Sequence, residues 1–115
     1  SAVSPANGGR NSRKQTKTKI VKFGKGENSA TYEESLTRGG TYKFIVNARK
    51  NQVLAVRVGT DSGSVTFNIS HKGKTIPTSV NTEKWTDKLT SGGDYQINVK
   101  RKSGSGKFLI EITVE

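Results

Sequence analysis

The feature that most constrains this chain is a regular alternation of apolar and polar residues within short segments. Segment 41–48 is the clearest case, because every second residue is apolar: Tyr42, Phe44, Val46 and Ala48. Successive side chains of a β-strand point to opposite faces of a sheet, so this alternation predicts half-buried strands. The pattern recurs in segments 30–36, 53–58, 65–70, 84–89, 93–99 and 107–114.

The patterned segments predict an all-β fold. Turn residues recur about every 8–12 residues and no segment has the period of a long amphipathic helix, which is typical of sandwiches and barrels. We therefore predict a single antiparallel β-sandwich, jelly-roll-like, of about eight short strands. Segment 75–80 contains Pro77, which cannot donate to a strand ladder, so we predict an edge strand or a bulge there.

The last two predicted strands enclose the basic segment KRKSGSGK, residues 100–107. We expect strands 93–99 and 107–114 to form a hairpin with this segment at its tip, because Gly104 and Gly106 make chain reversal easy. Four cations among eight residues exceed what a turn needs. Two interpretations remain open: a contact for an acidic partner, or charge that keeps an edge hairpin soluble.

The positive charge is concentrated at the amino terminus. The formal net charge is +11; residues 1–26 hold seven cations and no acid, whereas residues 27–115 hold 13 cations and 9 acids. Residues 1–16 are small, polar and punctuated by Gly and Pro, so we predict a flexible, disordered basic leader there and the β-sandwich domain at 17–115. Residues 10–25 would attract polyanions non-specifically, or form a solvated tail.

Three absences bound the class of protein. The chain has no cysteine, which excludes disulfides and thiolate metal sites. It has no methionine, even at position 1, so we expect a processed chain that is secreted or periplasmic. No apolar run approaches the roughly 18 residues of a membrane-spanning helix, so we expect no membrane span.

The side chains offer little for catalysis. His71, the single histidine, lies in the turn SHKG without an acid or nucleophile beside it, and we expect it to be solvated. Glu33 and Glu34 are adjacent, so on a strand they point to opposite faces. A distant carboxylate pair such as Asp61 and Asp94 remains formally open for glycosidic chemistry. We predict a protein that is not an enzyme.

Metal and stacking sites have little more support. The loop GTDSGS, 59–64, offers oxygen ligands near Asp61 but lacks the carboxylate density of a calcium loop, so we predict a structural turn, no metal and no cofactor. Most aromatic residues fall on the inward phase of their strands, which disfavours a surface for stacking nucleic-acid bases. Trp85 is the one strong candidate for a glycan-stacking platform, and a position at the rim of the core is its alternative.

Two stretches resemble a group of bacterial secreted β-sandwiches. FGKGENSATYEESLTRGGTYKFIVNARKNQVLAVRV (23–58) is similar to the group's order of a G-x-x-S-A-T segment, a Y-x-F-x-V-x-A strand, a basic turn and a Q-x-L-x-V-x-V strand. WTDKLTSGGDYQINV (85–99) is similar to its W-x-x-x-L-(small)-x-G-D-Y-x-I-x-V segment. The group includes pre-peptidase C-terminal (PPC-like) domains and periplasmic inhibitors of g-type lysozyme. The resemblance covers residues 20–115 and implies a sandwich.

The resemblance also implies a partner-binding site. In lysozyme inhibitors of several kinds, a Ser-Gly motif and a nearby basic residue on a protruding loop enter the enzyme's glycan cleft, which catalytic carboxylates line. The matching positions here are Ser91, Gly92 and Tyr95 in SGGDY. The basic segment occupies the place of the inhibitors' own basic loop, which adds Lys100, Arg101, Lys102, Ser103, Ser105 and Lys107.

These observations lead to a ranked set of functions. We predict first an inhibitor of a cell-wall lytic enzyme, g-type lysozyme, whose acidic cleft receives the cationic loop. The alternatives are an accessory module of the PPC-like type that binds cell-wall polysaccharide through Trp85 and the basic arm, and a structural or adhesive protein–protein interaction domain. Because a basic lysozyme would repel a chain of this charge at long range, a local complementary patch must outweigh the net charge.

Overall fold

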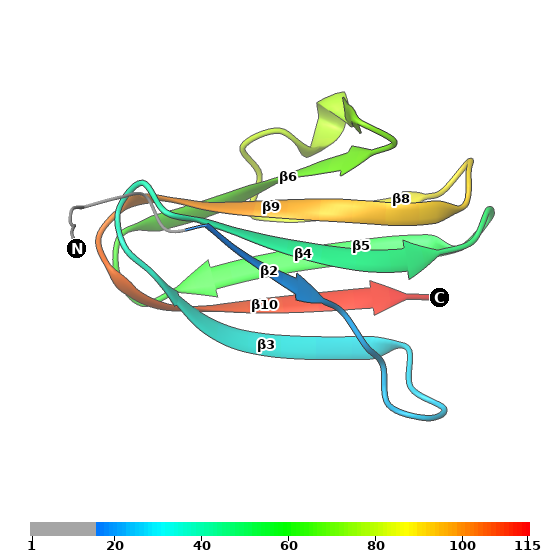
Figure 1. The fold of residues 1–115 in the computed structure, drawn as a ribbon, viewed down its shortest axis with the longest axis horizontal. Helices are drawn as coiled ribbons and strands as arrows, with labels where there is room; N and C mark the ends of the chain where they lie inside the picture. Colours follow the sequence, from blue (N-terminus) through cyan, green and yellow to red (C-terminus); the bar gives the residue numbers. More distant parts are fainter. Residues whose placement is uncertain (1–15) are drawn as a thin grey trace, which may run out of the picture.

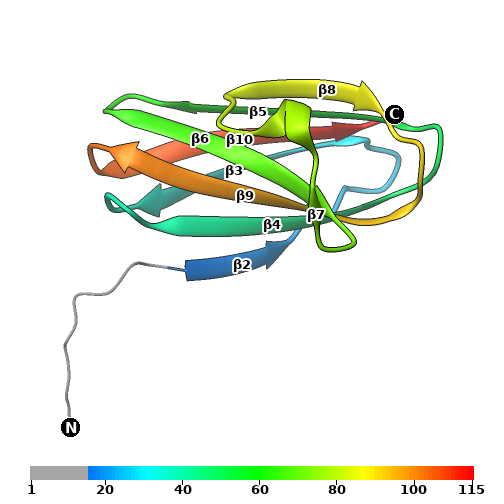
Figure 2. The same cartoon turned by 90° about the horizontal axis from the view of Figure 1, so that it is seen from above.

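The computed structural model describes residues 16–115 and confirms the predicted all-β sandwich. The predicted flexible leader lies outside the described residues, apart from its last residue, Thr16, which begins a strand. One sheet has four strands, in the order β3 (Ser29–Leu36), β10 (Gly106–Val114), β5 (Val53–Thr60) and β8 (Lys84–Lys88). The other has five, in the order β2 (Thr16–Ile20), β4 (Thr41–Ala48), β9 (Gly93–Ser103), β6 (Ser64–His71) and β7 (Lys74–Thr75). The two sheets lie face to face in Figures 1 and 2.

The alternation read from the sequence places the core as predicted. On β4 the inward residues are buried, and their outward neighbours are more exposed. Three phenylalanines are almost completely buried between the sheets: Phe44, Phe67 and Phe108. Phe44 and Phe108 meet edge to face, with ring centroids 6.3 Å apart. Burial of these side chains is the main favourable contribution to a small sandwich, because apolar area removed from water contributes about 25 cal/mol per Å².

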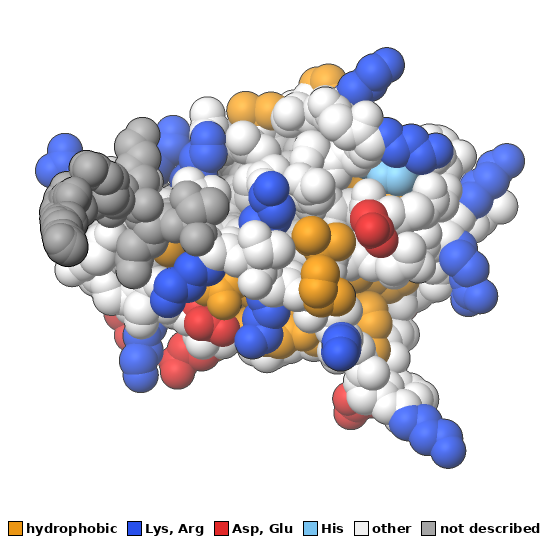
Figure 3. Space-filling model, viewed as in Figure 1, with side chains coloured by type: hydrophobic (Ala, Val, Ile, Leu, Met, Phe, Trp, Pro, Cys, Tyr) orange, Lys and Arg blue, Asp and Glu red, His pale blue; other side chains and the backbone are white. Residues whose placement is uncertain are grey.

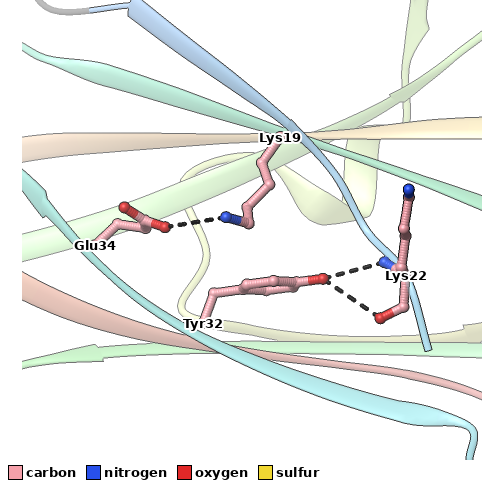
Figure 4. A network of polar contacts seen from close by, with 4 residues as sticks. All are labelled: Lys19, Lys22, Tyr32 and Glu34. Atoms are coloured by element: carbon pink, nitrogen blue, oxygen red, sulfur yellow. Dashed lines mark hydrogen bonds and ion pairs between the residues drawn. The ribbon is translucent and has the colours of Figure 1, made fainter. Parts of the chain in front are cut away.

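The strand β2 connects the two sheets at one open edge. It pairs in parallel with β4 of the five-stranded sheet, while its side chains reach β3 of the other sheet (Figure 4). The backbone N–H of Lys22 donates to the hydroxyl of Tyr32 at 3.1 Å, and Lys19 Nζ lies 3.6 Å from a carboxylate oxygen of Glu34. Lys19 also lies over the Tyr32 ring, 5.2 Å from its centroid. The folded domain therefore includes three of the basic residues near the amino terminus: Lys17, Lys19 and Lys22.

The predicted edge strand or bulge at 75–80 is wrong beyond Thr75, the last residue of the edge strand β7. The strand β7 has two residues, and the chain then enters a 3-10 helix, η1 (Pro77–Ser79). Pro77 suits the first position of a helix because the backbone N–H it lacks would have no partner there. Ser79 closes the turn: its buried hydroxyl donates to the carbonyl of Ile76 at 2.6 Å and accepts from the N–H of Ile69 at 2.8 Å.

The predicted hairpin of the last two strands is also wrong. The strand β9 pairs with β4 and β6, whereas β10 pairs with β3 and β5 in the other sheet. The short turn between Ser103 and Gly106 therefore carries the chain from one sheet to the other (Figure 1). Gly104 packs there against the turn between β5 and β6, since a Cβ at Gly104 would lie 3.0 Å from the Cα of Gly63.

Candidate functional site

The two parts of the predicted binding site lie at opposite ends of β9. We call the end formed by turns 49–52, 72–73 and 89–92 the Ser91 end, and the end formed by turns 61–63 and 104–105 the crossover end. Figure 1 shows the Ser91 end on the right and the crossover end on the left. Gly93 begins β9 and Ser103 ends it, ten residues later. At about 3.3 Å per residue, roughly 33 Å separates the two ends, so both cannot enter one enzyme cleft side by side.

At the Ser91 end, one hydrogen-bonded cluster is formed by four residues: His71, Ser91, Asp94 and Tyr95. The hydroxyl of Tyr95 donates to the carbonyl of Ser91 at 2.5 Å. His71, the last residue of β6, stacks its ring on Tyr95, with centroids 4.0 Å apart and planes 7° apart. Its Nε2 lies 3.0 Å from Ser91 Oγ and its Nδ1 lies 2.9 Å from the carbonyl oxygen of Asp94. Every polar atom of the ring is therefore bonded, and the expectation of a solvated His71 is wrong.

Burial shifts the pKa of Tyr95, one of the four residues of this cluster. Tyr95 is 3% exposed, and this burial raises the pKa of its hydroxyl above its usual range. A phenol that stays protonated remains a hydrogen-bond donor, so the bond to the Ser91 carbonyl persists over a wide pH range. Ser91 itself is half-buried, and the neighbouring Thr90 is exposed.

The doubled glycine of SGGDY has a steric reason. A Cβ at Gly92 would lie 3.3 Å from the backbone nitrogen of Lys50 and 3.4 Å from the carbonyl oxygen of Ala48. Gly93 has φ of 128°, and a Cβ there would lie 3.2 Å from the His71 ring. Both glycines therefore let the Ser91 turn approach the turn after β4 and the ring of His71.

A cleft of about 350 Å³ opens beside this cluster, between the β7–η1 segment and β8. Its lining includes His71, Lys74, Pro77, Trp85, Lys88 and Ser91. Exposed cations surround the Ser91 end on two turns, on β7 and on β8, and they are Arg49, Lys50, Lys72, Lys74 and Lys88. The nearby carboxylates on β8 and β9 are Asp87 and Asp94. Figure 3 shows the same balance, with several blue side chains and few red ones at its right-hand end.

At the crossover end, Arg101 is structural rather than a docking residue. Its side chain is 1% exposed. Its two terminal nitrogens donate to five acceptors: the carbonyls of Ser62, Ser103, Gly106 and Lys107 and the hydroxyl of Thr60. These acceptors lie in and beside the turns by which the chain passes between the two sheets, which explains why a guanidinium occupies this end of the core. The expectation of an exposed Arg101 is therefore wrong.

The other residues of the basic segment are exposed. Lys100 and Lys102 lie on the last part of β9, and Lys107 lies at the start of β10, 3.7 Å from a carboxylate oxygen of Glu33. Ser103 and Ser105 flank the crossover turn and are exposed as well. The crossover end thus presents three lysines, of which one has an acidic neighbour in an exposed ion pair.

Trp85 does not form a glycan platform. Its ring is 7% exposed, and its Nε1 donates to the hydroxyl of Thr78 at 3.0 Å. A platform must expose a whole ring face to a sugar, so this prediction is wrong and the alternative, a residue at the rim of the core, is confirmed. The polysaccharide interpretation loses the residue on which it rested.

The remaining candidates for chemistry lie apart. Asp61 is in the turn at the crossover end and Asp94 is at the Ser91 end, so the structure separates this carboxylate pair. Among residues 16–115, no three His, Cys, Asp or Glu side chains group as a metal site would require. The carbonyl of Ser62, beside Asp61, accepts a hydrogen bond from a guanidinium, and this positive charge disfavours a calcium ion there.

The comparisons identify structural neighbours. No protein-family model matches the chain, and no curated protein matches its sequence. The crystal structure of PliG from Aeromonas hydrophila, a periplasmic lysozyme inhibitor of g-type lysozyme, has a TM-score of 0.74 at 22% identity over 90% of this chain and 100% of PliG. PliG from Salmonella Typhimurium has a TM-score of 0.69 at 23% identity, over 86% of this chain and 98% of that one.

A more distant neighbour has the same architecture. The pre-peptidase C-terminal domain of a collagenase from Bacillus anthracis has a TM-score of 0.51 at 19% identity, and the match covers 92% of this chain and 100% of that domain. The resemblance inferred from the sequence is thus confirmed at the level of fold. In the part of the chain that the structure describes, no helix is long and apolar enough to cross a membrane.

Proposed function

We propose that this chain is a non-enzymatic inhibitor of g-type lysozyme and that its Ser91 end contacts the enzyme. The observation that supports the proposal most is the hydrogen-bonded cluster of Ser91, Tyr95 and His71 beside a cleft, on a fold shared with g-type lysozyme inhibitors. Those inhibitors are periplasmic proteins, which supports a periplasmic or secreted location for this chain.

The chemistry of the Ser91 end suits an acidic cleft. Glycosidases of the usual kind act through a pair of carboxyl groups that flank the scissile bond. The Ser91 hydroxyl can hydrogen-bond to such a carboxyl group, and hydrogen bonds to charged groups are stronger than neutral ones. Exposed lysines around the same end, such as Lys74 and Lys88, add attraction for a negatively charged cleft.

The lysines of the crossover end have a separate part in the proposal. Lys100, Lys102 and Lys107, with Ser103 and Ser105, lie roughly 33 Å from Ser91 along the extended β9 strand. We assign them to long-range attraction of acidic surfaces rather than to the contact itself. At physiological ionic strength the Debye length is about 8 Å, so their effect on binding at the other end is screened.

Inhibition of purified g-type lysozyme tests the proposal. We expect the native chain to inhibit cell-wall hydrolysis, and Ser91→Ala to weaken inhibition about tenfold or more, because one hydrogen bond to a charged group contributes about 1.5–3 kcal/mol. Ser105→Ala at the crossover end is the matched control and should inhibit like the native chain. Absence of inhibition by the native chain, or equal inhibition by both variants and the native chain, would contradict the proposal.

A further inference from the structure

His71 makes three contacts, and one of them is with Ser91, the proposed contact residue. It continues the inward phase of β6 and lies opposite Tyr95 in the strand register, which explains the parallel stack of the two rings. The stack fixes the plane of the imidazole. Within that plane, one nitrogen faces the Asp94 carbonyl and the other faces the Ser91 hydroxyl.

The partners of the ring determine where its proton lies. A carbonyl oxygen only accepts hydrogen bonds, so Nδ1 must carry a hydrogen and donate to Asp94. A neutral imidazole has one N–H, which leaves Nε2 as an acceptor. The Ser91 hydroxyl must then donate its single hydrogen to Nε2. Its other available acceptor, the carbonyl of Gly92, is farther away at 3.5 Å, so the hydroxyl presents only its lone pairs to a partner.

We infer that His71 is a positioning residue that sets whether Ser91 accepts or donates a hydrogen bond at the lysozyme contact. This inference rests on the proposed function. When the imidazole is neutral, Ser91 Oγ is an acceptor for the partner. When the imidazole gains a proton, Nε2–H donates to Ser91 Oγ and the hydroxyl hydrogen turns outward, where it can donate to an ionised carboxylate of the enzyme cleft.

The surroundings of His71 leave this change of direction open. The charged or titratable groups that face it are Tyr95 and Asp94 on β9, Lys74 on β7, and Asp87 and Lys88 on β8. The Asp94 carboxylate accepts from the side-chain amide of Asn47 at 3.0 Å, so it is already engaged on β4. Two of these groups are lysines and two are carboxylates, and among the described residues none forms an ion pair with His71.

Two variants separate this role from a merely structural one. His71→Gln places an amide near Nε2 that can donate to Ser91 at any pH, whereas His71→Phe keeps a ring on Tyr95 but removes both polar atoms. We expect the native chain to bind lysozyme at least about tenfold more tightly at pH 5 than at pH 8, and both variants to lose most of this change. The glutamine variant should bind more tightly than the phenylalanine variant.

Nitrogen NMR of the free protein provides a readout that needs no lysozyme. At pH 8 we expect the His71 ring to be the Nδ1–H tautomer, and its signals to change in Ser91→Ala. The Nε2–H tautomer, or an unchanged pH dependence of binding in both His71 variants, would overturn the inference. If the native chain binds no lysozyme at any pH, the proposed function fails, and the tautomer in the free protein still decides whether His71 directs Ser91.

Discussion

Two polar side chains, the half-buried His71 and the buried Arg101, distinguish the two ends of this molecule. Each lies two residues beyond the last apolar residue of an inward series, after Ile69 on β6 and after Val99 on β9. Each lies where a strand ends and hydrogen-bonds to groups of the adjoining turns. The first orients a hydroxyl at the Ser91 end, and the second holds the backbone at the crossover end.

Arg101 makes the clearest prediction at this scale. Arg101→Lys removes the planar arrangement of donors that serves five acceptors, and each hydrogen bond made by a charged group contributes about 1.5–3 kcal/mol. We expect the free energy of unfolding to fall by about 2–4 kcal/mol, measured by urea denaturation. The exposed neighbour is the control: Lys102→Gln should change stability by less than about 0.5 kcal/mol. Equal urea midpoints for the two variants would show that Arg101 does not hold this end together.

Tyr42 makes a prediction about alkaline stability. Burial raises the pKa of its hydroxyl above the usual range, and the negative charge of Glu34, to which the hydroxyl is hydrogen-bonded, raises it further. The folded-state pKa is therefore higher than the unfolded value of about 10. The stability linked to this group is complete below about pH 10 and is lost as the pH rises through the folded-state pKa. Melting temperatures measured between about pH 9 and 11 should fall less for Tyr42→Phe than for the native chain.

A steeper alkaline loss in the Tyr42→Phe variant would contradict this assignment. Tyr95, whose pKa is also raised, is present in both proteins and cancels in the comparison.

The sequence predicted part of the site at this scale. Ser91, Gly92 and Tyr95 were identified from SGGDY, and the structure brings them together. His71 and Arg101 were misplaced because their strands were ended one residue or more too early, at 70 and at 99. The alternation of inward and outward residues did indicate both positions, because His71 lies two residues after Ile69 and Arg101 lies two residues after Val99. Charged and polar residues are, however, seldom expected to face the core.

At the scale of strands and turns, the crossover depends on the close contact of Gly63 with Gly104. Gly73, in a turn with open space around it, gives the comparison. Gly63 has φ of 70°, and a Cβ there would collide with the backbone of Ser103. Gly73, in the turn before β7, has φ of 80°, but nothing lies within 4 Å of its Cβ position. The two residues therefore share the backbone requirement for glycine and differ in the space available.

This pair gives a matched test. Gly73→Ala should lower the free energy of unfolding by about 1–2 kcal/mol, because alanine is strained at positive φ. Gly63→Ala should lower it by at least about 2 kcal/mol more, because the two turns must also separate. Denaturation midpoints of the two variants give the comparison. Similar losses would mean that the turns at the crossover end are free to move apart.

The strand segments were predictable and one connection was not. Alternation located the long strands within a few residues, because half-buried strands require it. A short Ser/Gly turn, however, suits both a hairpin within one sheet and a passage between two sheets. The deciding contacts, Arg101 with the Ser62 carbonyl and Gly104 with Gly63, join residues about 40 positions apart in the sequence, a distance over which local patterns carry no information.

At the scale of the whole molecule, charge distribution matters more than net charge. The total of +11 would repel a basic lysozyme. With a Debye length of about 8 Å, a partner at the Ser91 end responds mainly to the charges nearest to it. The resemblance to lysozyme inhibitors placed Ser91 and the basic segment in one site, whereas the length of β9 separates them.

The most direct measurement is calorimetric titration of purified g-type lysozyme with two double variants, one for each end. Lys74→Glu with Lys88→Glu reverses two exposed charges of the Ser91 cleft, and Lys100→Glu with Lys102→Glu makes the same change of net charge at the crossover end. We predict one-to-one binding by the native chain, a loss of at least about tenfold in affinity for the first variant and less than about threefold for the second. Binding lost only in the crossover variant, or no binding by the native chain, would contradict the assignment of the Ser91 end.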